Sequence, residues 1–489
     1  MVAVQVRVLP WLSLLAALGC APPGSPDGEG SDAPLLRDPQ GSIQLLLHAP
    51  AGVGPQPQCV AELCTSLAGL VDGADKTIDF ALYGVRGQPR IVEAMQQAQG
   101  RGVLVRGVVD RDADGLNYYA DTEAFVKALG HVRDDGKVDE RRVKEAQRTV
   151  YPEPRCAPPE GHLGPVQCLA YDLGDRCLLA AHSSREPLDE GAAIMHDKFV
   201  VVDSRVVWTG STNVSDTCSG GYNANLVTVI DSRKIAAGYL AELDQMYEEG
   251  RFHEDKRSAG PLRVMVGDAE VELMFSPQDT PIRERLRPLV KGAHERIDVA
   301  VFYLTHKLLT ADLIDAHLRG VEIRVIIDAT AAANGFTKHE LLRAVGIPVK
   351  VEDWGGKMHM KSAVIDGKTL ITGSMNWTTA GDDTNDENVV IIHSEALAEQ
   401  YTEFYEQLWA DIDDRWLHEN PDPESRDSGT ACTDGIDNDY DGTIDALDPG
   451  CGESPPPLPP LPPWHIVDKG GRMTCEPEML RAAVAHAGG

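Results

Sequence analysis

The sequence predicts an α/β protein built as an internal duplication of two similar halves. The first observation is a motif, His-x-Lys-x4-Asp-x6-Gly-Ser-x-Asn, that occurs twice in the 489 residues. The second is that the apolar segments before each motif repeat as well. The third is that short β-branched runs alternate with amphipathic stretches in both copies, which is typical of α/β units around a largely buried sheet. Repetition on this scale indicates that a whole structural unit was duplicated.

Each copy of the motif supplies six residues. They are His196, Lys198, Asp203, Gly210, Ser211 and Asn213 in the first half, and His359, Lys361, Asp366, Gly373, Ser374 and Asn376 in the second. At ordinary amino-acid frequencies, one chance match in a chain of this length has odds of about 10⁻⁵, so two chance matches are negligible.

The N-terminal segment has the features of an export signal. Arg7 precedes an apolar run from Val8 to Leu18, which is too short to span a membrane. Gly19 and Cys20 follow, and a cysteine after a small residue resembles the lipobox of bacterial lipoproteins. The sequence therefore predicts a lipoprotein-type signal peptide over residues 1–20 and lipidation of Cys20. It also predicts export, either to the cell envelope as a lipoprotein or as a secreted protein.

Residues 21–40 are rich in Pro, Gly, Ser and Asp, which predicts a flexible tether. The first half then covers residues 41–255. Its predicted strands include residues 78–83 and 199–202, and an amphipathic helix follows the motif. The apolar residues of that helix recur at helical spacing and are Tyr239, Leu243, Met246 and Tyr247.

The second half covers residues 256–418 and repeats this order. Residues 297–303 and 362–365 are its predicted strands, and the helix after its motif has an apolar face of Tyr401, Phe404, Tyr405 and Leu408. The stretch from Asp110 to His196 is much longer than the equivalent stretch from Asp328 to His359, so the first half carries an insertion. We place the insertion near residues 134–190 and expect either a lid beside the site or a remote decoration.

The segment 419–452 is acidic and predicts a calcium-binding loop. Five aspartates stand at positions 1, 3, 5, 9 and 12 of a twelve-residue loop, with glycine at position 6. The predicted ligands are Asp437, Asp439, Asp441, Asp445 and Asp448. No amphipathic helices flank the loop, so we expect a structural calcium site rather than an EF-hand, or alternatively a solvated acidic turn. The composition of residues 453–489 predicts a proline-rich spacer and a tail.

The ten cysteines fit an oxidising compartment. Close spacing predicts two disulfides, Cys59 with Cys64 and Cys432 with Cys451. Without Cys20 the count is odd, which implies a free thiol, and Cys475 is the expected one. The pairing of the remaining four stays open, and these are Cys156, Cys168, Cys177 and Cys218.

The doubled motif predicts phosphoryl-transfer chemistry. Side chains two apart on a strand project to one face, so each half offers an imidazole and an ammonium to one pocket. One histidine can attack phosphorus and become a covalent phosphohistidine, while the other protonates the leaving oxygen and then activates water. The lysines, with the predicted phosphate-binding residues Ser211, Asn213, Ser374 and Asn376, can hold the non-bridging oxygens. This chemistry requires no cofactor or metal.

The motif pair resembles the phospholipase D superfamily, over the part of the chain from Ile43 to Trp416. Residues 274–279 (Met-Phe-Ser-Pro-Gln-Asp) match the usual entry strand of its second half. The resemblance implies two α/β halves packed face to face, with one active site at their interface. It also implies that His196 is the nucleophile, that His359 is the general acid and base, and that Asp203 and Asp366 are structural.

One position departs from the family pattern. Glu387 follows His359 at the spacing of the family carboxylate that orients a catalytic histidine, whereas the same spacing after His196 leads to Ala224. A histidine without that carboxylate loses control of its tautomer. Asn223, Asn225 or Asp216 are the candidate substitutes, and an exchange of roles between the two histidines is the alternative.

The substrate predicted from these features is a phospholipid, cleaved at its head group at a membrane surface. A formal net charge of −31 opposes binding of an extended polyanion, because nucleic-acid affinity comes largely from Lys and Arg neutralising phosphates. The alternatives are an envelope or secreted endonuclease of the same superfamily and an inactive binding scaffold. No feature predicts an obligate protein partner.

Overall fold

The fold is described by a computed structural model that covers residues 34–50, 52, 54–111, 119–136, 177–178, 193–333, 337–439, 444–452, 465–468 and 471–474. Predictions for residues 1–33, which include Cys20, lie outside the described residues. So do those for most of the insertion and for Cys156, Cys168 and Cys475. Among the described helices, none has the length and apolar character needed to cross a membrane.

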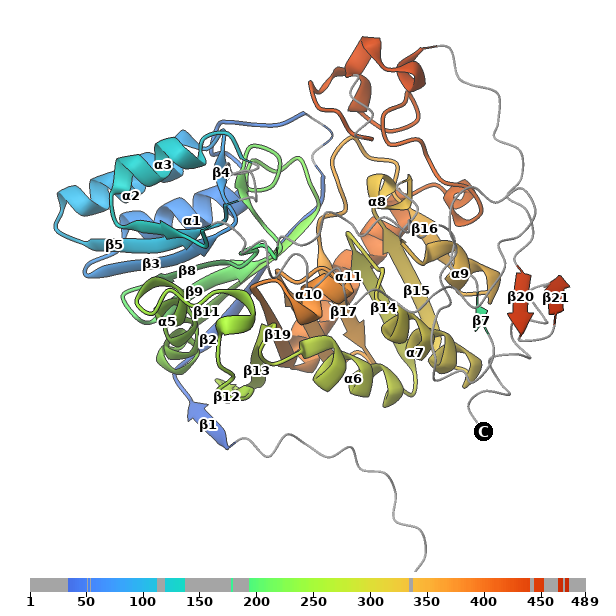
Figure 1. Cartoon of the computed structure of the whole chain (residues 1–489), viewed down its shortest axis with the longest axis horizontal. Coiled ribbons are helices and arrows are strands. Elements are labelled where there is room, and N and C mark those ends of the chain that lie inside the picture. Colours follow the sequence, from blue (N-terminus) through green and yellow to red (C-terminus); the bar gives the residue numbers. More distant parts are fainter. Residues whose placement is uncertain are drawn as a thin grey trace, which may run out of the picture. The chain divides into compact units, whose positions relative to one another are not determined.

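The first half is a mixed sheet of seven strands in the order β2-β11-β9-β8-β3-β5-β6. Its strands are β2 (Ser42–His48), β3 (Thr77–Leu82), β5 (Leu104–Val109), β6 (Val132–Asp134), β8 (Lys198–Val202), β9 (Val206–Gly210) and β11 (Asn225–Asp231). Helices α1 (Glu62–Asp72), α2 (Pro89–Gly100) and α3 (Thr122–Leu129) cover one face, and α5 (Arg233–Tyr247) covers the other (Figure 1). A short parallel pair, β4 (Val85–Arg86) with β10 (Val214–Ser215), lies beside this sheet.

The second half repeats this sheet strand for strand and extends it at one edge to nine strands. The order is β1-β12-β13-β19-β18-β17-β14-β15-β16. Its strands are β1 (Leu35–Asp38), β12 (Leu262–Val266), β13 (Ala269–Ser276), β14 (Arg296–Val301), β15 (Glu322–Ile327), β16 (Val349–Val351), β17 (Lys361–Ile365), β18 (Thr369–Gly373) and β19 (Glu387–His393). From β13 to β16 the order matches β2 to β6, which confirms the internal duplication.

The helices of the second half also lie on both faces of its sheet. One face carries the π-helical turn Ile282–Leu286, α6 (Arg287–Lys291), α7 (Lys307–Leu318), α8 (Ala329–Ala333) and α9 (His339–Ala344), and the other carries α11 (Glu395–Asp411). The short α10 (Thr379–Asp383) follows the second motif. The amphipathic helices predicted after the two motifs are therefore α5 and α11, and each begins at a serine, Ser232 or Ser394, whose side chain caps the first turn.

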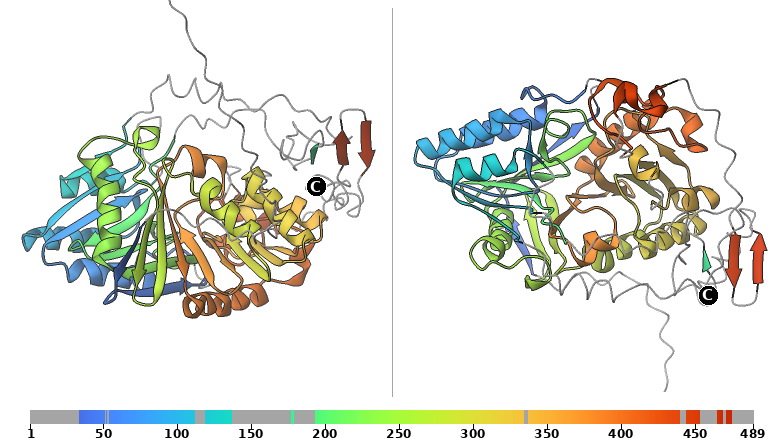
Figure 2. Two further views of the ribbon diagram at one scale, coloured as in Figure 1. Left: turned by 90° about the horizontal axis from the view of Figure 1, so that it is seen from below. Right: turned by 45° about the horizontal axis from the view of Figure 1, so that its top comes forward.

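Alternation along the strands explains why both faces are buried. In β3, Phe80 packs with α1 and α2 on the outer face, whereas Ala81 faces the inner cluster. That inner cluster is continuous across the two halves, since it joins Phe199 and Tyr239 of the first half to Val390 and Tyr401 of the second. The two halves lie side by side in all views (Figures 1 and 2).

Two boundaries differ from the sequence-based expectation. Strand β1 lies within the predicted tether, because Leu35–Asp38 pairs in parallel with β12. A three-stranded sheet of β7 (Cys177–Leu178), β20 (His465–Asp468) and β21 (Gly471–Thr474) joins part of the insertion to part of the predicted tail. The backbone pairing available to these segments could not be read from their composition.

The acidic C-terminal segment packs on both halves. It forms the 3-10 turns Ala431–Thr433, Asp445–Leu447 and Pro449–Cys451, and a further 3-10 turn, Asp414–Leu417, precedes it at the end of the second half. The Tyr222 hydroxyl lies 2.9 Å from Thr430 Oγ1, and Thr330 donates to the Asn438 carbonyl at 2.7 Å. The predicted disulfides Cys432–Cys451 and Cys59–Cys64 are both present, while Cys218 is a buried free thiol.

Candidate active site

The two motif histidines stand just before the first residues of β8 and β17, and each is held by the opposite half. The His196 amide donates to the Asp386 carbonyl at 2.9 Å, and the His359 amide donates to the Ala224 carbonyl at 3.0 Å. Isolated parallel bridges join Met195 to Asp386 and Ala224 to Met358. The halves therefore exchange main-chain hydrogen bonds around a pseudo-twofold centre, and the two motifs meet there.

Lys198 and Lys361 are buried beside their histidines. Lys198 Nζ donates to the His196 carbonyl at 2.7 Å, and Lys361 Nζ donates to the His359 carbonyl at 2.6 Å. Aromatic rings lie near both ammoniums, with Lys198 Nζ 5.6 Å from the Tyr83 centroid and Lys361 Nζ 5.0 Å from that of Phe302. Burial lowers the pKa of Lys198 to about 8 and that of Lys361 to about 7.

The electrostatics of the histidines indicate one shared site. Burial, followed by the charges of Lys198 and Lys361, holds the pKa of His196 well below its usual value. Burial and the same two lysines lower the pKa of His359. Each imidazole therefore lies within electrostatic range of the lysines of both halves. Both imidazoles are neutral without a ligand, so each has an unprotonated nitrogen.

Glu387 contacts His196 rather than His359. Its carboxylate oxygens lie 2.8 and 2.9 Å from His196 Nδ1, and Ser374 Oγ donates to Oε2 at 2.7 Å. The expectation that this carboxylate orients the histidine of its own half is therefore wrong, because β19 meets the start of β8 across the interface. Burial raises the pKa of Glu387, whereas the charge of Lys198, the hydrogen bond from Ser374 and the charge of Lys361 favour its carboxylate form. With Nδ1 engaged, Nε2 is the ring nitrogen of His196 left for chemistry.

Asn225, not Ala224, is the counterpart of Glu387. Each is the first residue of its strand, and Ser211 Oγ donates to Asn225 Oδ1 at 2.8 Å just as Ser374 Oγ donates to Glu387. The expected equivalence of Ala224 is wrong because the first half has one more residue between motif and strand. Asn225 Oδ1 lies 3.3 Å from His359 Nδ1. An amide oxygen therefore stands where the other histidine has a carboxylate.

The other two candidate substitutes lie elsewhere. Asp216 forms an ion pair with Arg86 at 2.9 Å, and Asn223 Nδ2 donates to Cys218 Sγ at 3.3 Å. The Cys218 sulfur lies 3.8 Å from His359 Nδ1. Reasoning from sequence missed this thiol, because no spacing relates Cys218 to the second motif.

The serines and asparagines of the motifs take different positions. Ser211 and Ser374 are fully buried and support Asn225 and Glu387, so the structure places them behind the histidine partners rather than at a phosphate. Asn213 Nδ2 donates to the Tyr119 hydroxyl at 3.0 Å. The side-chain oxygens of Asn213 and Asn376 are buried without a hydrogen-bond partner in the described part of the chain. Phosphate binding by these asparagines stays a prediction.

The motif aspartates and glycines build the scaffold. The Asp203 carboxylate accepts three amides, from residues 75–77, and the Asp366 carboxylate accepts three from residues 294–296, at 2.7–3.0 Å in each case. These bonds tie the turn after each motif strand to the start of β3 or β14, as expected for structural residues. A side chain at Gly210 or Gly373 would approach a carbonyl oxygen of the neighbouring strand to 2.1 or 2.2 Å, so only glycine fits.

The predicted calcium ligands are only partly brought together. Asp437 and Asp439 have carboxylate oxygens within 4.8 Å of one another and of the buried Glu424, which the loop spacing did not reveal. Asp445 accepts the Gly435 amide at 3.1 Å and Asp448 accepts the Gly450 amide at 2.6 Å, while Asp441 lies outside the described residues. These three carboxylates are oxygen donors of the kind that calcium prefers.

Comparison with known proteins agrees with this geometry. Residues 67–247 and 286–409 match the family model described as cardiolipin synthase, PLD-like domain. The chain is 32% identical to the mitochondrial cardiolipin hydrolase of Xenopus laevis over 206 residues, which are 40% of this chain and 97% of that protein. It is 41% identical to a phospholipase D of Rickettsia felis over 113 residues, 23% of this chain and 56% of that protein.

Among solved structures, the phosphatidylserine synthase of Haemophilus influenzae is similar in fold. The two share 12% sequence identity with a TM-score of 0.50, over 79% of this chain and 90% of that chain. At this identity the similarity concerns the arrangement of the two halves and not the reaction.

Proposed function

The chain belongs to the family of phospholipase D-like proteins described as cardiolipin synthase, PLD-like domain, and on that premise we propose that it hydrolyses phospholipid head groups through a covalent phosphohistidine. The observation that carries the proposal is the convergence of four groups at the interface of the halves. Both histidines precede motif strands that meet across the interface, Lys198 and Lys361 lower the pKa of His196 and of His359, and all four side chains are buried.

In the first step His196 Nε2 attacks the phosphorus of the diester. A nitrogen–phosphorus bond forms, the bond from phosphorus to the leaving oxygen breaks, and His359 gives that oxygen a proton. Glu387 at Nδ1 of His196 stabilises the positive charge that the ring acquires. Lys198 and Lys361 hold the non-bridging oxygens as negative charge develops.

His359 must carry a proton to act as the acid, although it is neutral in the free protein. After burial, the two lysines are what lowers its pKa. A bound phosphodiester brings a negative charge between those lysines, offsets them and raises the pKa of His359. Binding of the substrate thereby prepares the acid.

In the second step water attacks the phosphohistidine. His359, now deprotonated, takes a proton from the water, an oxygen–phosphorus bond forms and the nitrogen–phosphorus bond breaks. His196 returns to its starting state. The chain and the attacking water supply every proton in this cycle, so the proposal includes no cofactor or metal at this site.

A phospholipid is the favoured substrate class for two reasons. The net charge of −31 opposes a polyanion, and a lipid anchor on Cys20 would hold the enzyme at a phospholipid surface. Two relatives, a cardiolipin hydrolase and a phospholipase D, act on phospholipids by name and support the same class.

The test is a side-by-side assay of the purified mature protein. Mixed phospholipid vesicles, single-stranded DNA and duplex DNA are each incubated with EDTA present, with the His196→Ala and His359→Ala variants as blanks. We expect head-group release from vesicles that both variants lack. Cleavage of DNA without head-group release would favour the endonuclease, and turnover of neither substrate would favour the inactive scaffold.

A further inference from the structure

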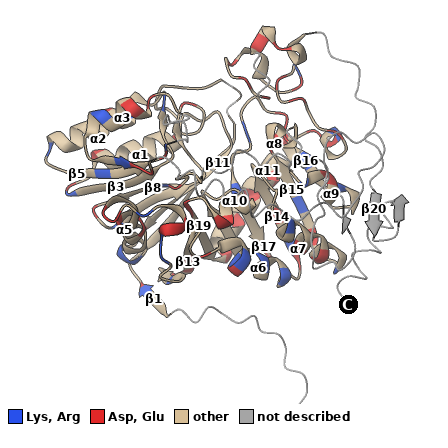
Figure 3. Cartoon of the chain, in the orientation of Figure 1, with Lys and Arg blue, Asp and Glu red and all other residues tan. Residues whose placement is uncertain are grey.

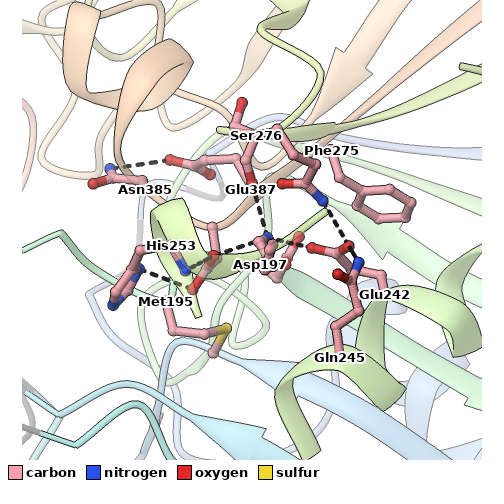
Figure 4. A network of polar contacts seen from close by, with 12 residues as sticks. Met195, Asp197, Glu242, Gln245, His253, Phe275, Ser276, Asn385 and Glu387 are labelled. Carbon is pink, nitrogen blue, oxygen red and sulfur yellow. Dashed lines mark hydrogen bonds and ion pairs between the residues drawn. The ribbon is translucent and has the colours of Figure 1, made fainter. Parts of the chain in front are cut away.

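Two cationic residues of the segment between the halves are buried next to the catalytic interface. His253, in the 3-10 turn His253–Asp255, is 6% exposed, and Lys256 just after it is also 6% exposed. His253 lies 3.0 Å from Asp386 and 3.3 Å from Asp135, and Lys256 pairs with Glu242 and, at 2.8 Å, with Asp386. Figure 4 shows His253, Glu242 and Glu387 in this network of polar contacts. The cluster draws on both halves.

Asp386 connects this cluster to the nucleophile. Its carboxylate accepts the His253 amide at 2.7 Å and is paired with both cations. Its main chain donates to the Ile194 carbonyl at 3.0 Å and accepts the His196 amide at 2.9 Å. The next residue is Glu387, whose carboxylate contacts His196 Nδ1. Asp386 therefore has two roles. Its side chain is paired with His253 and Lys256, and its main chain sets the register between Glu387 and His196.

The second histidine provides an internal comparison. Ala224 directly precedes β11, as Asp386 directly precedes β19, and it makes the same main-chain pairing. Its amide donates to the Lys357 carbonyl at 2.8 Å, and its carbonyl accepts the His359 amide at 3.0 Å. The alanine has no side chain that ions could hold. Of these two main-chain pairings, only the one beside His196 is therefore supported by ion pairs from its own side chain.

We propose that Asp386, His253 and Lys256 form a positioning unit for His196. Held between the two cations, Asp386 fixes the pairing of residues 194–196 with residues 386–387, so that Glu387 meets Nδ1 and Nε2 points toward the substrate. None of the three contacts the substrate, and the unit acts only through Glu387 and the main chain of His196. The inference rests on the proposed function, because it takes His196 as the reacting group.

The charges of the unit persist over the neutral pH range. Burial lowers the pKa of His253, but Asp386 and Asp135 outweigh it and raise that pKa to about 10. Burial raises the pKa of Asp386, but His253 and Lys256 outweigh it and hold that pKa below its usual value. Burial raises the pKa of Asp197 and Glu242 to about 7 and 8, so protonation of these two acids accommodates any excess of negative charge.

The primary test is Asp386→Asn, which keeps the shape and main-chain bonds of the residue but removes its charge. We expect kcat to fall by about 100-fold with little change in KM, since a small misplacement of a reacting group has an effect of this order. In the substrate-free protein, ¹⁵N spectra of labelled histidine should show His196 changing from one tautomer, protonated at Nδ1, to a mixture. That measurement needs no turnover.

Two further variants separate positioning from folding. Lys256→Met combined with Glu242→Gln removes one cation and one acid together, and should give the same changes to a smaller extent. Asp298→Asn is the matched control, because Asp298 is fully buried and ion-paired with Arg296 and Arg324 on β14 and β15. It should lower the stability of the protein and leave the His196 tautomer unchanged.

The outcomes distinguish the two proposals. A changed His196 tautomer in Asp386→Asn, in a protein whose wild type cleaves no phosphodiester, would uphold the positioning unit and refute the proposed function. Folded Asp386→Asn and Lys256→Met/Glu242→Gln proteins with the wild-type tautomer and kcat would overturn the positioning unit. If Asp386→Asn does not fold, the double variant alone decides by the same criteria.

Discussion

At the scale of single residues, Glu387 and Asn225 stand at equivalent positions but give the two histidines different partners. A carboxylate at Nδ1 of His196 stabilises the cationic ring that forms when Nε2 bonds to phosphorus. The amide oxygen of Asn225 near Nδ1 of His359 is neutral, so it stabilises a protonated ring less than a carboxylate would. This division matches a nucleophile in the first half and an acid and base in the second.

The division of roles predicts different behaviour of the two alanine variants with an activated p-nitrophenyl phosphodiester, whose leaving group needs no proton. His196→Ala should form no covalent adduct. His359→Ala should form an acid-labile phosphoenzyme that accumulates, because water is no longer activated, with turnover reduced by about 10²–10⁴-fold. Mass spectrometry of base-quenched protein measures the adduct, and His418→Ala serves as an exposed control. An adduct in His196→Ala, and none in His359→Ala, would show that His359 is the nucleophile and His196 the general acid and base.

The two buried lysines predict how anion binding depends on pH. A lysine with a lowered pKa is charged below that pKa and loses its charge as pH rises through it. With values of about 7 for Lys361 and about 8 for Lys198, sulfate should bind best below pH 7 and lose affinity progressively above it. Sulfate keeps its own charge over this range, and calorimetry measures its dissociation constant. The Lys361→Met protein should bind sulfate more weakly with a smaller dependence on pH. An affinity that is constant from pH 6 to pH 9 would contradict the assignment.

At the scale of elements, the motif strands and the helices after them were predictable from sequence. The strands β8 and β17 follow directly from the buried β-branched runs around each motif, and α5 and α11 follow from their apolar faces. The entry strand of the second half was also predicted, since β13 ends at Ser276, which lies within the segment 274–279 that matched the family pattern.

The partners of the histidines could not be predicted in the same way. Counting residues from each motif assigned Glu387 to His359 and aligned it with Ala224, because chain distance contains no information on pairing across the interface. A single extra residue before β11 shifted the alignment, and only the strand register corrects it. Glu424, His253 and Lys256 were missed for a related reason, since they lie outside any repeated spacing and become functional candidates only through tertiary contacts.

The acidic C-terminal segment predicts a response to calcium that is local. Glu424, Asp437 and Asp439 offer carboxylate oxygens within 4.8 Å of one another, the type of ligand that calcium prefers, so calcium should protect residues 432–451 from protease. Glu424→Gln should weaken that protection, whereas Glu419→Gln, an exposed residue with the same charge change, should not. Limited proteolysis with and without EDTA measures the effect.

Catalysis should survive the chelator, because the described hydrogen bonds from the loop to the two halves, at Thr330, Lys357 and Tyr222, involve none of the motif residues. Protease susceptibility that calcium does not change would refute the calcium site. Loss of turnover in EDTA would instead place a metal in the main reaction.

At the scale of the whole molecule, the distribution of charged side chains disfavours binding of a polyanion. Acidic side chains outnumber basic ones, 76 to 45, and in the view of Figure 3 the basic residues are scattered over both halves rather than joined in a continuous track. The lysines of the active site are buried instead. This distribution of charge supports the proposal of a substrate that presents one phosphate, rather than a chain of phosphates, to the protein.

Retention at a membrane is predicted to depend on the N-terminal cysteine. Cys20→Ser should move the protein from the membrane fraction to the soluble fraction of the exporting cell, because stable anchoring needs the two or more acyl chains that lipoprotein processing attaches. Immunoblots of the fractions measure the change, and Ser25→Ala in the same segment is the control. Mass spectrometry that finds unmodified Cys20 in the mature protein would refute the predicted lipid anchor.

The dependence of activity on salt separates the two substrate classes most directly. Nucleic-acid affinity should fall by roughly 0.9 log units per log unit of salt for each phosphate neutralised on a duplex, because counterions are released. A phospholipid presents one reactive phosphate to Lys198 and Lys361, whose charges are buried and therefore little screened by salt. Initial rates on vesicles should then change little between about 50 mM and 500 mM salt, a range over which the Debye length falls more than threefold. With anionic lipids they should rise slightly, since salt screens the repulsion from a protein of net charge −31. A steep loss of DNA cleavage with salt, together with no head-group release at any salt concentration, would assign the enzyme to nucleic acid.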